Sequence, residues 1–333
     1  MTSTKRRLGQ YFTRQRTWLQ PQVVDFIKSR NAEIAYDPFA GNGDLLLVAG
    51  ELGIDEVVGL DIDKSLGWDW NDSLIDIPAV NNSIIITNPP YLTNYSAKRK
   101  KIFDHVEKYF ATTKHEDLYQ VALDRCLNAG AGVIIIPETF INSFFPKSRV
   151  NSITILEDNP FEDTDVPVCV VCFDGIEKPL REISLYKNDE FLGSLEFFEN
   201  LRLMPSNSLP FRFNDVNGPI ALRAVDTTDP NRPIKFMRKE ELEYNLAGIK
   251  HSSRLITIVQ TNLAPGKLDE LVDCSNTILT DYRNRTKDVL LSPFKGNRKD
   301  GSRRRRLDYS TARAILEMAG EKVLPNRKLT LFI

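Results

Sequence analysis

A proline pair that directly follows an apolar run marks the stretch of the sequence best suited to chemistry. Residues 88–91 read Asn-Pro-Pro-Tyr and follow residues 83–87, which read Ser-Ile-Ile-Ile-Thr. Such a short apolar run is typical of a buried parallel strand, and proline ends the strand because it has no N–H group to continue the ladder. We therefore expect a rigid turn at the carboxyl end of a strand, where open α/β sheets bind their ligands.

This turn would suit chemistry at a planar amino group, which is a poor nucleophile because its lone pair is delocalised. The side-chain oxygen of Asn88 and the backbone carbonyl of Pro89 could each accept one of its hydrogens. Both contacts would favour the positive charge that develops as the nitrogen attacks. The ring of Tyr91 could stack on the planar group. The alternative is that Pro89 and Pro90 form a plain turn, since proline pairs are common in loops.

A glycine-containing loop upstream of this turn predicts a nucleoside-binding site. Residues 33–36 are a strand candidate, the sequence DPFAGNGD follows at residues 37–44, and we expect a helix from Leu45 to about Leu52. The two glycines of this loop would let backbone approach a ligand closely, and the helix N-terminus would point its N–H groups into the same space. An acidic residue at the strand end would repel a pyrophosphate and suits a ligand with a cationic amino group.

Two further acidic positions extend this predicted site. Asp61 ends the next strand candidate, at about the spacing from Asp37 at which an acidic side chain reaches ribose hydroxyls. A strand-end cap is the alternative role for Asp61. Within residues 67–78, either Asp69 or Asp72 could accept a hydrogen bond from an adenine amino group, and we choose Asp72.

One aromatic residue and two basic runs are candidates for contact with a nucleic acid. Phe161 lies in a polar loop, so it is either a stacking platform or an anchor packed under the sheet. Residues 98–101 read KRKK and predict phosphate contacts or a solvated helix face. Residues 295–306 hold seven basic residues and one acidic residue, which predicts a flexible cationic loop that contacts phosphates or guanine edges, or else a solvated charge run. The candidates that we choose from these two runs for contact with a nucleic acid are Lys98, Arg99, Lys100, Arg298, Lys299, Arg303, Arg304, Arg305 and Arg306.

The composition is that of a globular protein. The chain has 333 residues, of which 41% are hydrophobic and 27% charged, and its formal net charge is −1, so any affinity for nucleic acid must come from local patches. The N-terminus has no apolar leader, and no stretch is apolar enough to span a membrane. Cys169 and Cys172 fall in a strand-like run, which favours buried free thiols in a reducing cytoplasm over a metal or redox site. We expect no metal site.

The pattern of elements changes along the chain. Residues 33–175 alternate strand and helix candidates, which is typical of an α/β fold with a mainly parallel sheet. From residue 205 to 233 Pro and Asn are frequent and no long helical pattern occurs; a strand candidate at residues 255–259, a helical turn at 267–271 and a helix at 311–322 follow. We therefore predict a catalytic domain over residues 1–180 and a mixed α+β domain over residues 181–333.

Taken in order, these motifs resemble those of the gamma group of adenine-N6 DNA methyltransferases from restriction–modification systems. The resemblance covers roughly residues 8–173, and it is specific because the motifs occur together in one order. The matching motifs are LGQYFT (8–13), DPFAGNGD (37–44), GLDID (59–63), NDSL (71–74), NPPY (88–91), DLYQVALDRCL (117–127), GVIIIPETF (132–140) and NPF (159–161).

The resemblance implies a fold, a cofactor and a substrate. It implies a Rossmann-like class I methyltransferase sheet of seven strands with an antiparallel last strand, followed by a target-recognition domain. The substrate would be double-stranded DNA whose target adenine is rotated out of the stack. A cognate restriction endonuclease would be a separate protein, and we expect a monomer. The implied residues for S-adenosylmethionine are Tyr11, Thr13, Asp37, Phe39, Gly41, Gly43, Asp61, Ile62, Asp72 and Ser73; the implied catalytic residues are Asn88, Pro89, Pro90, Tyr91 and Phe161, the last stacking on the flipped base.

Other readings of the same motifs stay open. Release-factor glutamine methyltransferases share NPPY, because a glutamine amide poses the same electronic problem, but they normally carry an extra domain ahead of the cofactor loop. An RNA adenine or guanine methyltransferase is a further alternative, although the chain offers no recognisable RNA-binding module. Cytosine-N4 methyltransferases more often have Ser in place of the motif's Asn. A non-catalytic DNA-binding subunit with the same fold is the alternative from a different class.

Overall fold

The computed structural model of the chain describes residues 16–111, 113–161, 164–243 and 255–324. The chain divides into two compact units after Phe197, which we call unit 1 and unit 2. A short helix, α6 (Leu195–Leu201), runs across the division.

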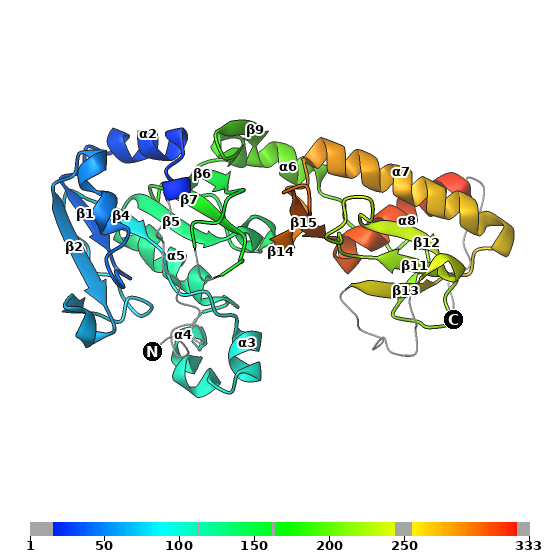
Figure 1. Ribbon diagram of the computed structural model, residues 1–333, viewed down its shortest axis with the longest axis horizontal. Helices are drawn as coiled ribbons and strands as arrows, with labels where there is room; N and C mark the ends of the chain where they lie inside the picture. The colour runs from blue at the N-terminus through cyan, green and yellow to red at the C-terminus, as the bar shows by residue number, and fades with distance from the viewer. Residues whose placement is uncertain (1–15, 112, 162–163, 244–254, 325–333) are drawn as a thin grey trace. The chain divides into compact units, whose positions relative to one another are not determined.

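Unit 1 is built on one nine-stranded sheet (Figure 1). From β3 to β5 all neighbouring strands are parallel, whereas β7 is antiparallel to both of its neighbours, β5 and β6. The predicted α/β fold with a mainly parallel, Rossmann-like sheet and an antiparallel seventh strand is confirmed. In order across the sheet the strands are β3 (Asp69–Trp70), β2 (Glu56–Asp61), β1 (Ile34–Asp37), β4 (Ser83–Thr87), β5 (Gly132–Pro137), β7 (Val168–Phe173), β6 (Val150–Ile155), β8 (Ser184–Lys187) and β9 (Glu190–Ser194).

Two strands more than expected extend this sheet. β8 pairs with β6 in parallel, and β9 returns antiparallel to β8. The sheet therefore continues past residue 180, where we expected the first domain to end, because the edge of β6 receives a further hairpin rather than a linker.

The central strands are buried on both faces, as parallel sheets require. Every residue of β5 and β7 is buried, and Ile84 and Ile86 of β4 share one apolar cluster with Val23 and Ile27 of helix α2. Gly132 opens β5 at a close approach to β4, where an added Cβ would lie 2.5 Å from the carbonyl oxygen of Ile85. The helices of unit 1 are α2 (Pro21–Ser29), α3 (Asn94–Arg99), α4 (Glu107–Phe110) and α5 (Leu118–Ala129).

The helix expected after the glycine loop is not an α-helix. Residues 46–48 and 50–52 form two separate 3-10 turns, and Gly53 ends the second with a left-handed backbone. Gly50 begins the second turn, and glycine is a poor residue for a helix interior, so the short segment takes the tighter 3-10 form.

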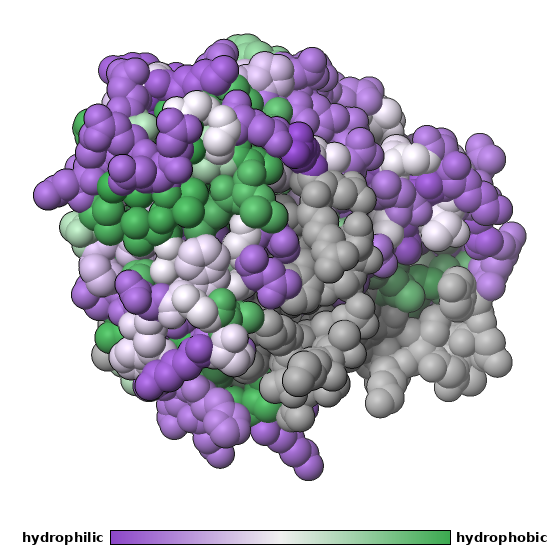
Figure 2. Space-filling model, turned by 60° about the vertical axis from the view of Figure 1, so that its left-hand side comes forward, coloured by the Kyte–Doolittle hydropathy of each residue, from purple (hydrophilic) through white to green (hydrophobic). Residues whose placement is uncertain are grey.

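The β3 edge of the sheet exposes apolar side chains. β3 pairs with Leu60 and Asp61 at the end of β2. Val57, near the start of β2, is exposed, as are Leu47 and Trp70. Figure 2 turns this side of the molecule toward the viewer and shows apolar surface among hydrophilic side chains.

Unit 2 is a mixed α+β unit with a four-stranded antiparallel sheet and a separate hairpin. The expected strand near residues 255–259 and the expected helix near 311–322 are confirmed as β13 and α8. The elements are β10 (Arg212–Phe213), β11 (Ile220–Arg223), β12 (Lys235–Arg238), β13 (Ile256–Gln260), α7 (Leu268–Thr286), the hairpin strands β14 (Ser292–Asn297) and β15 (Arg303–Arg306), and α8 (Tyr309–Val323).

Two expectations about unit 2 were wrong. The helical turn near residues 267–271 is the start of α7, a helix of 19 residues whose buried positions, among them Leu271, Ile278 and Tyr282, follow helical spacing. The many polar residues of its other face hid this pattern in the sequence. The flexible basic loop is the hairpin β14–β15. No helix within the described ranges is long and apolar enough to cross a membrane.

Candidate functional site

The parallel strands β1, β2, β4 and β5 bring the predicted residues of unit 1 to one edge of the sheet. The hydroxyl of Thr87, at the end of β4, donates a hydrogen bond of 2.6 Å to the carboxylate of Asp37, at the end of β1. We call this side, where the parallel strands end, the catalytic edge. Tyr11 and Thr13 lie outside the described residues, so their predicted contacts stay predictions.

Asp37 is the buried acidic group of this edge. Its carboxylate accepts hydrogen bonds from the Thr87 hydroxyl and from the backbone N–H of Phe39, at 2.9 Å. Burial raises the pKa of Asp37 to about 7, with a smaller contribution from the nearby charge of Asp61, against the two hydrogen bonds. A buried carboxyl of this kind gains most from a cationic partner, which would favour its ionised form.

Asp61 braces the glycine loop. One of its oxygens accepts from the backbone N–H of Gly41 at 2.9 Å, and the other accepts from Asp63 at 2.8 Å. The strand-end role that we weighed as the alternative is therefore present. It does not exclude a ribose contact, because a carboxylate oxygen can accept more than one hydrogen bond. Gly41 and Gly43 both have positive φ angles, which the turn requires.

Trp68 is a residue of this loop region that the sequence did not single out. Its indole N–H donates to the carbonyl oxygen of Gly41 at 2.9 Å. Its ring lies so close to Gly43 and Gly59 that an added Cβ would be 2.8 Å and 2.5 Å from it, respectively. The two glycines therefore make room for the indole, and Trp68 holds the loop against β2. In the sequence, the only sign of this packing is Gly59, a glycine within an otherwise apolar strand.

The predicted adenine-contacting residues lie beyond β3 and are engaged by α4. Asp72 accepts from the ammonium of Lys108 at 2.7 Å and from the hydroxyl of Tyr109 at 3.1 Å. Ser73 is buried, and Ile62, at the end of β2, is exposed. A contact between Asp72 and an adenine amino group stays a prediction, and it would have to share the carboxylate with Lys108 and Tyr109.

In the Asn-Pro-Pro-Tyr turn, Tyr91 holds the side-chain amide of Asn88 in place. The hydroxyl oxygen of Tyr91 lies 2.5 Å from Oδ1 of Asn88 and 2.8 Å from the carbonyl oxygen of Ile135 in β5. A phenol has one hydrogen, so it donates to one of these two acceptors at a time. The turn therefore holds the Asn88 oxygen beside a hydroxyl that has an alternative acceptor.

Phe161 takes the anchoring position rather than an open platform. Its side chain is 4% exposed and belongs to the main apolar cluster of unit 1. Its ring meets that of Tyr91 edge to face, with centroids 6.1 Å apart and an interplanar angle of 64°. We expected a base to lie between these two rings, but in this arrangement the rings contact each other. Asn159 shapes the loop by accepting from the backbone N–H of Phe161 at 3.0 Å.

The segment after the turn is tied to the start of α5 and carries the first basic run. Thr93 pairs with Asp117 in an antiparallel bridge and caps α3 by accepting from the backbone N–H of Ser96 at 2.8 Å. Burial, with help from the neighbouring Glu116, raises the pKa of Asp117 to about 6. The predicted phosphate-binding residues Lys98, Arg99 and Lys100 lie on or directly after this capped helix.

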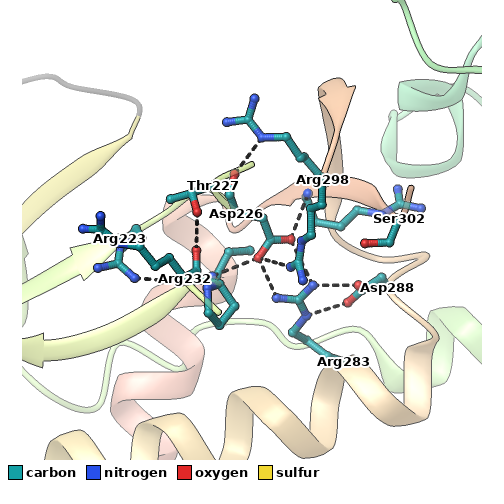
Figure 3. A network of polar contacts seen from close by, with 12 residues as sticks. Arg223, Asp226, Thr227, Arg232, Arg283, Asp288, Arg298 and Ser302 are labelled. Carbon is teal, nitrogen blue, oxygen red and sulfur yellow. Dashed lines mark hydrogen bonds and ion pairs between the residues drawn. The ribbon is translucent and has the colours of Figure 1, made fainter. Parts of the chain in front are cut away.

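The second basic run is organised by a buried carboxylate in unit 2. Asp226 accepts from Arg283 of α7 at 2.9 and 3.0 Å, from Arg298 at 2.6 Å and from the backbone N–H groups of Ile234 and Arg305 at 2.9 and 3.0 Å. Figure 3 shows Arg283 and Arg298 pointing at this carboxylate from different elements. Burial alone would raise the pKa of Asp226, but the hydrogen bonds from both arginines hold it below its ordinary value.

This network changes the reading of the basic run. Arg305 is buried and Arg298 is largely so, which argues against DNA contacts by these two side chains. Arg304 donates through Nε to the carbonyl oxygen of Asp226 at 2.8 Å and lies over the ring of Phe294. Lys299 is exposed. The prediction of a flexible loop is therefore wrong, because Arg298, Arg304 and Arg305 make contacts that stabilise the hairpin.

Comparison with known proteins gives likenesses of structure alone. Neither a protein-family model nor a curated sequence matches the chain. Similar solved structures include the M protein of the type I restriction enzyme EcoKI, at 12% identity over 84% of this chain and 72% of that chain, with a TM-score of 0.37. A Listeria monocytogenes protein described as a class I S-adenosylmethionine-dependent methyltransferase matches at 13% identity over 53% of this chain and 68% of that chain, with a TM-score of 0.34. TrmN from Thermus thermophilus matches at 17% identity over 46% of this chain and 47% of that chain, with a TM-score of 0.30. The chain thus spans about half the length of TrmN.

Proposed function

We propose that the chain is an S-adenosylmethionine-dependent methyltransferase that modifies the N6 amine of an adenine in double-stranded DNA. The observation that carries the proposal is the position of the Asn88 oxygen. The Tyr91 hydroxyl fixes it at the carboxyl end of β4, and on the neighbouring strand the buried carboxyl of Asp37 begins the glycine loop. An acceptor for an amino group and a carboxyl suited to a cationic cofactor thus share one edge of the sheet.

The residues around the glycine loop fit the cofactor. S-adenosylmethionine supplies the methyl group and carries a cationic amino group, and ionised Asp37 would pair with that group. Gly41 leaves the backbone accessible to a ligand, since an added Cβ would meet only the carbonyl oxygen of Phe39 at 3.9 Å, whereas the space beside Gly43 is filled by the indole of Trp68. Asp61 has acceptor capacity left for a ribose hydroxyl beside its two backbone hydrogen bonds.

The turn would act by stabilising charge on the attacking nitrogen. Oδ1 of Asn88 and the backbone carbonyl of Pro89 would accept the two amine hydrogens, so the nitrogen becomes more electron-rich as it attacks. The Asn88 oxygen has two lone pairs, so it can accept from the amine whether the Tyr91 hydroxyl donates to it or to the carbonyl oxygen of Ile135, which lies at 2.8 Å. The Tyr91 ring would stack on the base, supported from its edge by Phe161. A proton leaves the nitrogen after transfer.

The turn and the second unit support the proposed substrate. The N6 amine of adenine is paired inside a duplex, so the base would have to be rotated out to reach the turn. Unit 2 would recognise the target sequence, with the exposed cations of the hairpin contacting phosphates. The chain would act as a monomer and as the modification partner of a restriction system, with the endonuclease a separate protein.

The proposal is tested by methyl transfer from labelled S-adenosylmethionine to mixed-sequence duplex DNA, total RNA and a release factor. We expect label in DNA and, after digestion to nucleosides, in N6-methyladenine. The variant Asn88→Ala, which should still bind the cofactor, is the matched control for transfer by this site. Label in RNA or in protein would overturn the DNA assignment, and label in N4-methylcytosine would overturn the choice of base.

A further inference from the structure

A single phenylalanine beside the catalytic edge is fully exposed. Phe144 has a relative accessible area of 105%, and the next most exposed large apolar side chain in the described part of the chain, Leu47, reaches 77%. One exposed apolar side chain needs no explanation by itself. Its surroundings give this one significance, because the backbone on both sides of it is fixed.

Phe144 lies in a turn that a lysine holds from inside. The ammonium of Lys147 donates to the carbonyl oxygens of Ser143, at 2.7 Å, and Phe145, at 3.3 Å, which flank Phe144 on either side. The Ser143 hydroxyl donates to the carbonyl oxygen of Phe140 at 2.8 Å. Phe140 and Phe145 are both buried and anchor the turn. These contacts fix the backbone of the turn, so the Phe144 ring faces solvent.

A continuous series of contacts joins this turn to the Asn-Pro-Pro-Tyr turn. The ring of Phe145 stacks on His115, with centroids 5.2 Å apart and an interplanar angle of 26°. Two residues after His115, Asp117 forms its bridge with Thr93, and the backbone N–H of Leu118 donates to Leu92 at 3.0 Å. Phe144 is thus tied to the segment that directly follows Tyr91.

The same segment carries a second exposed aromatic ring and several cations. Tyr95, in the first turn of α3, is 66% exposed. Lys98 and Arg99 are exposed on that helix, and Lys114, next to His115, is exposed as well. Exposed rings interspersed with cations are the composition that suits nucleic acid, since rings stack on unpaired bases while cations contact phosphates.

We propose that Phe144 inserts into the base stack of the DNA next to the target adenine and stabilises the opened duplex while the base is out. This inference rests on the proposed function and extends it by naming the residue that favours base rotation. Unstacking and unpairing a base costs free energy, and an apolar wedge compensates for part of it. The contribution of such a side chain should therefore fall when the target base is already unpaired.

The test compares two DNA duplexes that differ only opposite the target adenine, one with thymine and one with an abasic site. With the paired duplex, Phe144→Ala should lower single-turnover methylation about tenfold or more, on the scale of base–aromatic stacking. With the abasic duplex the loss should be at most about threefold. A fluorescent 2-aminopurine at the target position should brighten less with Phe144→Ala than with the wild type, and Phe144→Trp should restore both readouts.

The control is Ile176→Ala, which removes an equally apolar side chain that is 64% exposed. Ile176 follows the end of β7, and β7 ends opposite the start of β5, away from the catalytic edge. Ile176→Ala should change the methylation rate of neither duplex. Equal losses by Phe144→Ala on both duplexes, or no loss on either, would overturn the wedge while leaving the proposed function in place. Failure of the wild type to methylate either duplex would overturn both.

Discussion

The sequence pointed both to the catalytic edge of unit 1 and to the basic run of residues 295–306 in unit 2. The run was expected as a flexible loop and forms a hairpin, and the two regions hold their residues in opposite ways. At the catalytic edge, Asp37 and Asn88 end neighbouring parallel strands, and the sheet alone brings them together. In the hairpin, Arg298 and Arg305 occupy the interior, around Asp226. A motif placed on a strand end determines where its residues lie, whereas a run of one charge does not determine which side chains face solvent.

The largest effect should come from the amide at the catalytic edge. Asn88→Ala removes the acceptor that Tyr91 fixes, so turnover should fall about 100-fold to 1,000-fold, the loss typical when one preorganised partner of the transition state is removed. The measurement is single-turnover methylation at saturating cofactor. Calorimetric affinity for S-adenosylmethionine should be unchanged, because Asn88 is not among the residues proposed to hold the cofactor. Turnover at the wild-type rate would show that the turn only ends a strand.

The matching change in the hairpin should destabilise unit 2. Asp226→Asn leaves Arg298 without Asp226 as its buried counter-charge and leaves Arg283 with Asp288 alone, and breaking a buried pair typically costs about 3–5 kcal/mol. All three tryptophans belong to unit 1, so their fluorescence reports that unit, while hydrogen exchange in α7 reports unit 2. We expect faster exchange in α7 with an unchanged tryptophan transition.

The control for this variant is Asp300→Asn, which removes a fully exposed carboxylate of the same hairpin. It should leave exchange in α7 as in the wild type. If both variants behave alike, the hairpin does not depend on its buried carboxylate. Because the pKa of Asp226 is held below its ordinary value, its stabilising contribution should persist above about pH 4 and be lost as the pH falls below that range.

The strands of the catalytic edge and the carboxylate of Asp226 show why the first region was easier to predict than the second. The run at residues 83–87 became β4 with those bounds, because a short β-branched run before a breaker indicates a strand buried on both faces. Asp226, in contrast, is one acid in a polar segment, and its partners lie at residues 283, 298 and 305. No local pattern signals such a contact.

Residues at the catalytic edge escaped prediction for a similar reason. The indole of Trp68 reaches Gly41, Gly43 and Gly59 through the fold rather than through sequence spacing. Phe161 was correctly placed near Tyr91, yet whether its ring would be buried or open depended on the packing of the loop that carries it. Sequence order thus located the candidate site, and tertiary packing decided which of its side chains are accessible.

An effect of intermediate size concerns the pH dependence of cofactor binding. With its pKa raised to about 7, Asp37 is protonated below that pH, and binding a cationic amino group then requires loss of the proton. Affinity for S-adenosylmethionine should fall up to about tenfold per pH unit below pH 7 and be highest between pH 7 and about pH 8, above which an α-amino group itself loses its proton. Calorimetry between pH 5.5 and 8 measures this. The variant Asp37→Asn should bind more weakly and without the pH dependence.

The same ionisation has an opposite consequence for the ligand-free fold. The pKa of Asp37 is higher in the folded chain than in the unfolded chain, so its contribution to stability is greatest at low pH and declines as the pH rises to about 7. Without cofactor, Asp37→Asn should therefore raise the tryptophan-detected unfolding temperature at pH 8 more than at pH 5. An equal shift at both pH values would mean that the carboxyl is not held in a buried environment.

The smallest effect separates the exposed cations of the hairpin from those that it uses internally. Lys299→Ala should leave the stability of unit 2 unchanged and reduce the slope of log affinity against log salt by about one, the value for one phosphate contact. Arg298→Ala should do the reverse, accelerating hydrogen exchange in α7 because Asp226 loses a partner at 2.6 Å. DNA titrations at several salt concentrations, with exchange measured on the same variants, distinguish the two. Arg298→Ala could instead reduce the salt slope as Lys299→Ala does and leave hydrogen exchange in α7 normal. That result would mean that Arg298 is not held by the buried network, and that the hairpin is the solvated charge run that composition alone suggested.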